Sequence, residues 1–321
     1  MNSVERLQQV FLRSMESDFS EPEWNRQPDT LYAPQRYILS MGGKRLRPVL
    51  ALMAAEAFGS NAQLALPVAH AVERFHNFSL IHDDIMDKAP LRRGKPTVHE
   101  TWGVNTGILS GDALLVLAYK SLLKSPKHIL SDLLDTFNQT ALEVCEGQQM
   151  DMDFESKERI EEGQYLQMIR SKTAVLLGCS LQMGSLISGA SKKASKSLFN
   201  FGLELGTSFQ IHDDLLDAYG SPEIFGKKLG GDIRSKKKTI LWIHLSNHKP
   251  DLLKSILRSE SDNKIAEILS AMESSGSRIY ADVQRKKHFD LAIASLQQVK
   301  SESCDIKDLE SFANWIYDRE V

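Results

Sequence analysis

Residues 67–88 read PVAHAVERFHNFSLIHDDIMDK. Pro67 stands where a helix begins, since the first turn does not need the N–H that proline lacks. The stretch that follows has no glycine or second proline to interrupt it and is long enough for about six helical turns. It predicts a helix from Pro67 to about Lys88 that ends in three aspartates, Asp83, Asp84 and Asp87.

The end of this helix is repeated further along the chain. Residues 81–87 read IHDDIMD, and residues 211–217 read IHDDLLD. Because residues i and i+4 share one face of a helix, Asp83 points with Asp87, and Asp213 points with Asp217. Like charges at this spacing repel each other. A divalent cation would offset the repulsion, and carboxylates with bound water suit Mg²⁺ shared with substrate phosphates. The alternative is two solvated acidic helix faces.

The rest of the chain also follows helical periodicity. An amphipathic helix opens it, with Val4, Leu7, Phe11 and Met15 on one face. A loop with Pro22, Pro28 and Pro34 follows, and a helical turn over 36–41 ends at a glycine pair. Further helices are expected over 48–58, 98–101, 108–123, 127–150, 160–189, 192–219, 235–246, 252–257, 263–274, 276–300 and 306–317.

No stretch alternates between apolar and polar residues like a strand, and no linker divides the chain. We therefore expect a single all-α domain over residues 1–321, with helices around a central cavity.

Composition narrows the class of protein. The 321 residues are 42% hydrophobic and 25% charged, with a net charge of −3, so no global field attracts nucleic acid or anionic lipid. The three cysteines, Cys145, Cys179 and Cys304, lack metal-site or disulfide spacing, which favours a reducing, cytoplasmic setting. The apolar stretches are too short to span a bilayer.

Basic groups stand close to both acidic clusters. Residues 42–48 read GGKRLRP and place three cations at the start of a helix, where anions bind favourably. Arg92 and Arg93 follow the first cluster, and arginine suits bidentate phosphate recognition. Lys172-Thr173 begins an apolar helical stretch. Lys227 and Lys237 follow the second cluster. The neighbouring Lys228, Lys236 and Lys238 are expected to be solvated surface.

With these motifs in this order, the chain resembles the trans-isoprenyl diphosphate synthases along nearly its whole length. The motifs that carry the resemblance are GGKRLRP at 42–48, DDxxD at 83–87, Arg92-Arg93-Gly94, Gly147-Gln148-x-x-Asp151, Lys172-Thr173, Gln210 with DDxxD at 213–217, and Gly226-Lys227. The resemblance implies an all-α bundle around a deep cavity, usually a homodimer, and a prenyltransferase that condenses isopentenyl diphosphate with an allylic diphosphate.

The resemblance also implies residue roles. Asp83 and Asp87 would bind two Mg²⁺, and Asp213 with Asp217 a third. The allylic diphosphate would be contacted by Arg92, Lys172, Thr173, Gln210, Lys227 and Lys237. The diphosphate of isopentenyl diphosphate would be held by Lys44, Arg47, His76 and Arg93. For His82 and His212 a structural hydrogen bond within the fold is the favoured reading.

In this family, bulky residues just before the first cluster form the floor of the pocket that limits product length. Phe78 lies five residues before Asp83, which is about 7.5 Å along a helix, with Ser79 and Phe75 beside it. One aromatic next to a small residue, without an insertion in the cluster, is similar to a geranylgeranyl (C20) synthase. Ideal geometry, however, puts Phe78 about 140° around the helix from Asp83.

Three alternatives stay open. A farnesyl (C15) or, less favoured, a longer-chain product is the nearest. A class I terpene cyclase shares the fold but usually carries an Asn/Ser/Glu metal motif in place of the second cluster. A regulatory subunit tends to lose the Asp-rich motifs, and both are intact here.

Overall fold

The computed structural model describes residues 3–220, 230–259, 261–301 and 304–318. Within these ranges the regular secondary structure is helical, apart from one short hairpin of two-residue strands. The expectation of an all-α fold is confirmed. Lys227 and Lys228 lie outside the described residues. The chain groups into two compact units. The first comprises residues 1–138, 179–199 and 299–309, and the second comprises residues 139–178, 200–298 and 310–321.

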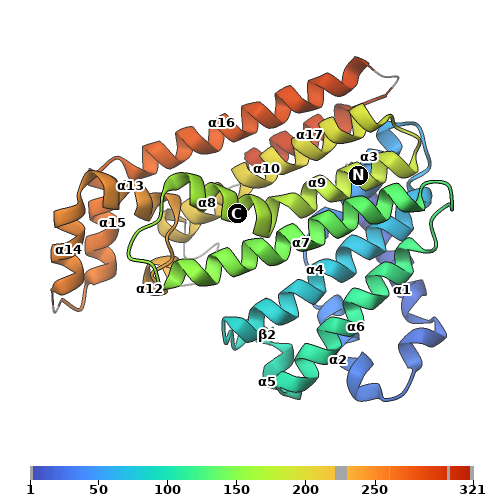
Figure 1. Cartoon of the computed structure of the whole chain (residues 1–321), viewed down its shortest axis with the longest axis horizontal. Helices are drawn as coiled ribbons and strands as arrows, with labels where there is room; N and C mark the ends of the chain where they lie inside the picture. The colour runs from blue at the N-terminus through green and yellow to red at the C-terminus, as the bar shows by residue number, and fades with distance from the viewer. Residues whose placement is uncertain (1–2, 221–229, 260, 302–303, 319–321) are drawn as a thin grey trace. The chain divides into compact units, whose positions relative to one another are not determined.

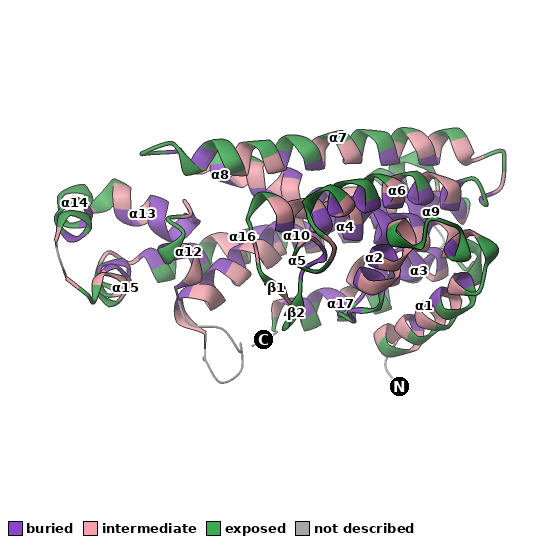
Figure 2. Ribbon diagram, turned by 90° about the horizontal axis from the view of Figure 1, so that it is seen from below, coloured by how far each residue is buried: buried purple, intermediate pink, exposed green. Residues whose placement is uncertain are grey.

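The first unit is built from the N-terminal helices (Figure 1). These are α1 (Ser3–Phe19), η1 (Pro22–Asn25), α2 (Asp29–Ser40), α3 (Leu46–Ala57), η2 (Ala62–Ala65), α4 (Leu66–Met86), α5 (Val98–Trp102) and α6 (Val104–Leu122). Helix α4 packs against α3 and α6. Figure 2 shows that buried residues dominate α3, whereas α1 alternates between buried and exposed positions. Helix α4 is therefore held by neighbours on two sides, which fixes the acidic residues at its end.

The second unit carries the helices that follow in sequence. They are α8 (Glu162–Ile169), a π-helical turn η3 (Arg170–Ala174), α12 (Gly231–Arg234), α13 (Ile240–His248), α14 (Pro250–Arg258), α15 (Lys264–Ser274) and α16 (Ser277–Gln297). The 3₁₀ turn η4 (Gln298–Ser301) has residues in both units. Helices α7 (Leu130–Glu155), α9 (Val175–Ile187), α10 (Lys192–Tyr219) and α17 (Lys307–Tyr317) have residues in both units. An apolar cluster that includes Tyr165, Ile211 and Trp242 forms the core of the second unit.

Most helices lie where the periodicity predicts them, and α10 has the predicted bounds. Three local predictions were wrong. Pro34 lies inside α2 and not in a loop, and α2 accordingly starts at Asp29. Residues 89–96, where no strand was expected, contain the antiparallel strands β1 (Leu91–Arg92) and β2 (Lys95–Pro96). The single helix predicted over 160–189 is divided by the π-helical turn, because its backbone hydrogen bonds shift there.

Within the part of the chain that the structure describes, no helix is both long and apolar enough to cross a bilayer.

Candidate active site

The first acidic cluster closes α4. Asp83 lies in the last turn of the helix and is half-buried, and Asp87 follows the helix and is exposed. The Asp87 N–H donates to the Asp83 carbonyl oxygen at 2.9 Å, so helical geometry continues to Asp87. The two carboxylates therefore stand one turn apart at the exposed end of α4, as the i, i+4 spacing predicts.

The middle aspartate of this cluster has a different surrounding. Asp84 is 2% exposed, and its two carboxylate oxygens accept from Nε and Nη2 of Arg92, each at 2.8 Å. Burial by itself lowers the pKa of Arg92, but the Asp84 carboxylate outweighs it and raises that pKa. Arg92 Nη2 also lies 3.8 Å from Asp83 Oδ2. The β-hairpin thus returns Arg92 to the end of α4 as a bidentate partner of Asp84.

The basic residues of 42–48 separate into two roles. Arg45 is buried and donates to the Glu73 carboxylate and to the Leu39 carbonyl oxygen, which makes it a structural residue. Lys44 is exposed. Arg47 lies against His76, with Nη1 and Nε2 3.2 Å apart. The sequence alone did not distinguish Arg45 from its neighbours, since its partner is 28 residues away.

Arg93 joins this group through the glycine pair. Its guanidinium donates to the Gly42 carbonyl oxygen, and a Cβ at Gly43 would lie 2.9 Å from its central carbon. Gly43 also has φ +116°, which side chains rarely adopt. The glycine pair therefore allows Arg93 to lie directly on the backbone before α3.

The electrostatics of this region favour an anion. Burial, with a smaller effect of Arg93, lowers the pKa of Arg47 to about 10, although Glu73 acts in the opposite direction. Burial also holds the pKa of His76 well below its ordinary value, with Arg47 and Arg93 adding to the effect. Arg93 shows the same direction, chiefly through burial and Arg45. A bound anion stabilises buried arginines whose pKa is depressed, so Arg47 and Arg93, with the His76 ring as a neutral hydrogen-bonding partner, are a chemically suitable diphosphate site.

The second acidic cluster lies near the end of α10. Its middle residue, Asp214, is 6% exposed. The Tyr165 hydroxyl donates to Asp214 Oδ2 at 2.7 Å, and Gln210 Nε2 donates to Asp214 Oδ1 at 3.3 Å. Thr173 Oγ1 in turn donates to Gln210 Oε1 at 3.1 Å. Burial, with Asp232 nearby, raises the pKa of Asp214 to about 8. Burial, followed by Asp214, also raises the pKa of Tyr165 well above its ordinary value.

The other two aspartates of this cluster are half-buried. Asp217 Oδ2 accepts from the Asp232 backbone N–H at 2.9 Å, and the Asp217 carbonyl oxygen accepts from the Gly230 N–H at 2.8 Å. Asp217 thus holds the start of α12 against α10, in addition to its predicted metal role.

Motifs of the second unit that are separate in the sequence contact one another in the structure. Lys172 lies in the π-helical turn, and its Nζ is 2.6 Å from Asp151 Oδ2. A Cβ at Gly147 would collide with the Lys172 backbone, so α7 can approach this turn only with glycine there. Gly206 packs closely on Ala174 in the same way, so α10 also approaches this turn at a glycine.

The second unit contains a cavity of about 230 Å³ beside the second acidic cluster. The lining includes four predicted site residues, Lys172, Thr173, Gln210 and Lys237, together with Asp151, Tyr165, Asp214, Asp232 and Lys238. Lys238 was expected to be solvated surface. It is half-buried and lies over the Trp242 ring, because α13 begins directly after it.

A divalent metal fits the donor set, but only with help from a ligand. Among the described residues, no group of three or more His, Cys, Asp or Glu side chains is arranged to hold an ion. Mg²⁺ is usually bound by one or two carboxylates, with waters and substrate phosphates completing the octahedron. The pairs Asp83/Asp87 and Asp213/Asp217 match that pattern.

The residues before the first cluster, Phe75, Phe78 and Ser79, share one face of α4, because their spacing is i, i+3 and i+4. Phe75 is buried, and Phe78 is half-buried with its ring 5.5 Å from Phe75 and 4.8 Å from His82. Ser79 Oγ donates to the His76 carbonyl oxygen at 2.8 Å. His82 Nε2 lies 3.0 Å from the Ile108 carbonyl oxygen, which supports the structural reading of this histidine.

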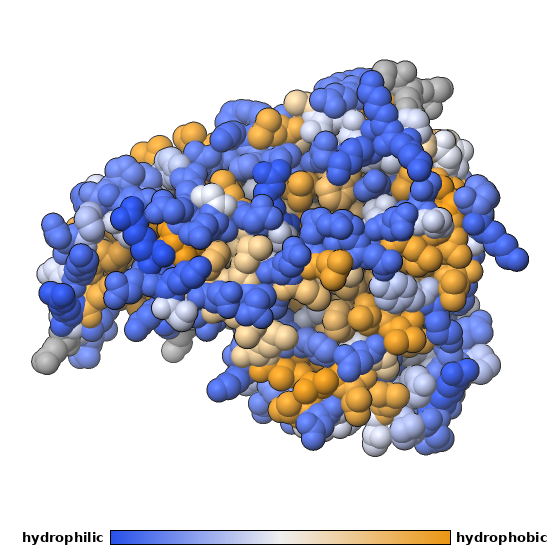
Figure 3. Space-filling view, viewed as in Figure 1, coloured by the Kyte–Doolittle hydropathy of each residue, from blue (hydrophilic) through white to orange (hydrophobic). Residues whose placement is uncertain are grey.

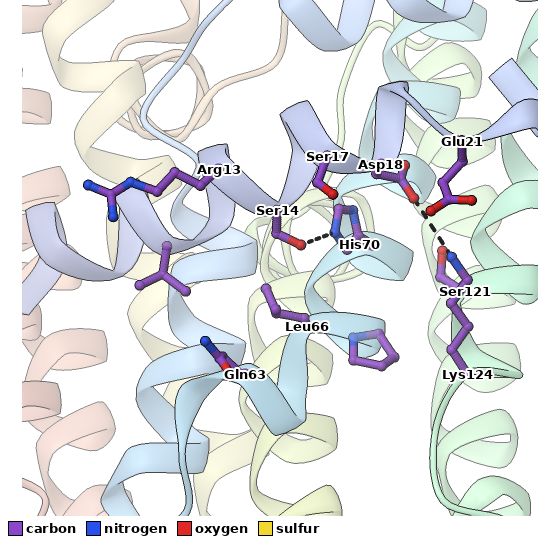
Figure 4. A pocket seen from close by; sticks show the side chains of 12 residues that line it. Arg13, Ser14, Ser17, Asp18, Glu21, Gln63, Leu66, His70, Ser121 and Lys124 are labelled. Atoms are coloured by element: carbon purple, nitrogen blue, oxygen red, sulfur yellow. Dashed lines mark hydrogen bonds and ion pairs between the residues drawn. The ribbon is translucent and has the colours of Figure 1, made fainter. Parts of the chain in front are cut away.

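A second cavity, of about 490 Å³, lies in the first unit between α1, α4 and α6 (Figure 4). His70 faces Ser14 across it, with Nε2 and Oγ 2.8 Å apart. Asp18, which also lines the cavity, is paired with Arg74. The cavity has neither a carboxylate pair at i, i+4 spacing nor a cluster of arginines, so it lacks the chemistry of a metal–diphosphate site.

Sequence reasoning missed several partners. Glu73, Tyr165 and Asp232 carry no motif and interact with site residues that are distant in the chain. Asp151 was noted within a motif, but its pairing with Lys172 was not predicted. The one sequence signal that could have indicated these partners is a polar residue within an otherwise apolar helical face.

Comparisons with known proteins agree on one family. The polyprenyl synthetase family model matches residues 28–274. A geranylgeranyl diphosphate synthase of Methanosarcina mazei is 44% identical over 220 residues, which are 68% of each chain. A geranylgeranyl pyrophosphate synthase of Geoglobus acetivorans is 36% identical over 297 residues, 92% of each chain. The crystal structure of a geranylgeranyl pyrophosphate synthase matches with a TM-score of 0.91 at 40% identity, over the whole of both chains.

Proposed function

The chain belongs to the polyprenyl synthetase family, and on that premise we propose that it is a prenyltransferase that makes geranylgeranyl diphosphate. It condenses isopentenyl diphosphate head to tail with allylic diphosphates. The observation that carries the proposal is the pair of DDxxD clusters, each on a helix and each close to basic side chains. The chain would act as one domain over residues 1–321.

The reaction needs charge stabilisation and not a protein nucleophile. The C–O bond of the allylic diphosphate breaks, and pyrophosphate leaves. The double bond of isopentenyl diphosphate attacks the allylic cation to form the new C–C bond, and a proton passes to the released pyrophosphate. Three bound Mg²⁺, held by Asp83 and Asp87 and by Asp213 and Asp217, would stabilise the charge on the leaving group.

The two substrates call on different basic groups. We assign the isopentenyl diphosphate to Lys44, Arg47, His76 and Arg93, since burial and the neighbouring Arg93 lower the pKa of Arg47 and an anion would offset both effects. We assign the allylic diphosphate to Arg92, Lys172, Thr173, Gln210 and Lys237. Lys227 keeps the same assignment from the family pattern. Water must be excluded, because it would trap the allylic cation.

The C20 length rests on the relatives and on the residues before the first cluster. The Methanosarcina and Geoglobus relatives are named as geranylgeranyl synthases. The Phe78 ring contacts the Phe75 ring in a tilted arrangement and is only half-buried, which fits a floor residue that a growing prenyl chain reaches. Farnesyl diphosphate is the alternative product.

The test is incubation of the purified protein with Mg²⁺, isopentenyl diphosphate and dimethylallyl, geranyl or farnesyl diphosphate. We expect a C20 diphosphate from each allylic substrate. If no pairing of isopentenyl diphosphate with an allylic diphosphate releases pyrophosphate, the proposal is wrong. A cyclic hydrocarbon formed without isopentenyl diphosphate would instead identify a cyclase. Phe78→Ala should lengthen the product, and Phe19→Ala, outside the pocket, should not.

We also propose that the chain is a homodimer through α6. This helix exposes Val104, Ile108, Leu109 and Val116 on one face. Figure 3 shows apolar side chains gathered where α6 runs in Figure 1. Exposed apolar patches of this kind mark interaction sites. Light scattering should give twice the chain mass, and Leu109→Glu should halve it. A wild-type monomer would contradict the assignment.

A cytoplasmic setting completes the proposal. Its support is that none of the three cysteines forms a disulfide.

A further inference from the structure

The hydroxyl of Tyr165 lies in the core of the second unit, directed at the second acidic cluster. We propose that Tyr165 is a positioning residue. By holding Asp214 in the wall of the cavity, it makes α10 present Asp213 and Asp217, rather than Asp214, to the metal-bound diphosphate. This inference rests on the proposed function and adds a residue that carries none of the family's motifs.

The geometry begins with the burial of both partners. Tyr165 is 1% exposed and Asp214 is 6% exposed. The hydroxyl meets Asp214 Oδ2 at 2.7 Å, a normal length for a hydrogen bond to a carboxylate. Tyr165 comes from α8, which packs against α13 and the π-helical turn that carries Lys172. The hydroxyl therefore cannot turn to solvent, and it donates to Asp214.

The other oxygen of Asp214 is held as well. Gln210, one turn earlier on α10, donates to Oδ1 at 3.3 Å, and Thr173 donates to Gln210 at 3.1 Å. The four side chains Thr173, Gln210, Asp214 and Tyr165 thus form a continuous hydrogen-bonded chain along the cavity wall. Both oxygens of Asp214 are bound to protein donors, which leaves this carboxylate poorly suited to a metal.

Helix geometry explains why the orientation of Asp214 matters. Neighbouring residues on a helix point about 100° apart. If α10 rotated about its axis so that Asp214 faced a metal, Asp213 and Asp217 would be carried away from that metal. Removing the hydroxyl leaves a buried carboxylate oxygen without a donor, and such a group seeks a new partner. The metal itself would be the available one.

The main test compares two tyrosine variants. Tyr165→Phe removes the hydroxyl and keeps the ring. Tyr280→Phe is the matched control, because its hydroxyl donates to the Glu162 carboxylate at 2.6 Å and Glu162 also lies on α8. We expect Tyr165→Phe to lower kcat by about 10-fold to 100-fold, as loss of an outer-shell partner does, and to raise the Mg²⁺ concentration needed for half-maximal rate. The KM for isopentenyl diphosphate should not change. Tyr280→Phe should match the wild type.

Binding without turnover gives an independent readout. Mg²⁺ with inorganic pyrophosphate should raise the melting temperature of the wild type and of Tyr280→Phe. For Tyr165→Phe the same shift should require about 10-fold to 100-fold more Mg²⁺. A purely structural role of Tyr165 would lower the melting temperature without moving this Mg²⁺ dependence.

A second variant covers the case in which Tyr165→Phe does not fold. Asp214→Asn keeps an oxygen that accepts from Tyr165. If Asp214 is a wall residue, Asp214→Asn should retain Mg²⁺–pyrophosphate binding within about 10-fold of the wild type, whereas Asp213→Asn should lose much more.

The outcomes distinguish a failure of the role proposed for Tyr165 from a failure of the proposed function. The inference is overturned if Tyr165→Phe has the same kcat and the same Mg²⁺ dependence as Tyr280→Phe. It is also overturned if Asp214→Asn binds Mg²⁺–pyrophosphate as poorly as Asp213→Asn does. A wild-type chain that forms no prenyl product overturns the proposed function, and with it this inference.

Discussion

The two acidic clusters have almost the same sequence but different anchors for their middle aspartate. On α4, Asp84 is bound by the guanidinium of Arg92 in a bidentate ion pair. On α10, Asp214 is bound by the neutral hydroxyl of Tyr165 and the amide of Gln210. In both cases the middle carboxylate is buried and the flanking ones are more accessible.

The difference concerns charge. Arg92 neutralises the charge of Asp84, and burial of the pair is compensated by a close contact. Nothing cationic compensates Asp214 in its hydrogen-bond network, and its pKa rises to about 8 as a result of burial. The same motif is therefore held as an ion pair in one cluster and as a neutral hydrogen-bond network in the other.

The largest effect is expected from the first aspartate of each cluster. Asp83→Asn and Asp213→Asn should each lower kcat by about 10³-fold, since each removes a carboxylate that would hold Mg²⁺ against the leaving group. Steady-state assays with saturating Mg²⁺ check this. Asp132→Asn, which affects a surface pair with Lys192, is the control and should be silent. Near-normal activity in either cluster variant would remove that cluster from the metal site.

The middle aspartates should differ in stability. Asp84→Asn leaves Arg92 half-buried without its carboxylate, so we expect a loss of about 3 kcal/mol in the free energy of unfolding. Asp214→Asn keeps the hydrogen bond from Tyr165. Because the pKa of Asp214 is about 8, its carboxyl is mostly protonated at pH 7, so the substitution removes little charge and the change should stay within about 1 kcal/mol. Urea denaturation at pH 7 measures both. Equal losses would mean that the anchors are equivalent.

The pH dependence of stability should also separate the clusters. The pKa of Asp214 is raised in the folded state, so its contribution is full at low pH and is lost as the pH rises toward 8. Between pH 6 and pH 8, the metal-free wild type should lose about 2 kcal/mol relative to Asp214→Asn.

His76, in the basic group beside the first cluster, should change the stability with pH in the opposite direction. The pKa of His76 is lowered, so its contribution is present above its ordinary pKa and is lost as the pH falls below about 6.5. Chemical denaturation from pH 5 to pH 9 tests both signs. Parallel curves for the wild type and Asp214→Asn would contradict the first.

The smallest effect is expected from the end of the second network. Thr173→Val keeps the shape of the side chain and removes the donor to Gln210, at a cost of about 1 kcal/mol in unfolding free energy. Thr136→Val, which loses only a bond to the Asp132 carbonyl oxygen in its own helix, is the control. A loss no larger than that of the control would detach Thr173 from the network.

Local periodicity explains how much could be predicted. The helical fold, the bounds of α10 and the shared faces of Asp83/Asp87 and Asp213/Asp217 follow from spacings of three and four residues. The division of the helix at 170–174 did not follow, because a π-helical turn has no strong sequence signal. The separate role of Arg45 was equally hidden, since it depends on a buried contact with Glu73.

The sequence by itself determined the chemistry: two pairs of carboxylates at helical spacing, with cations close by in the chain. The tertiary structure decided how each middle aspartate is held. Arg92 is eight residues from Asp84 and returns by a hairpin, whereas Tyr165 is 49 residues from Asp214 and reaches it only through the packing of α8. The physical reason is that helix geometry is fixed by neighbours in sequence, while burial and its hydrogen-bond partners are fixed by neighbours in space.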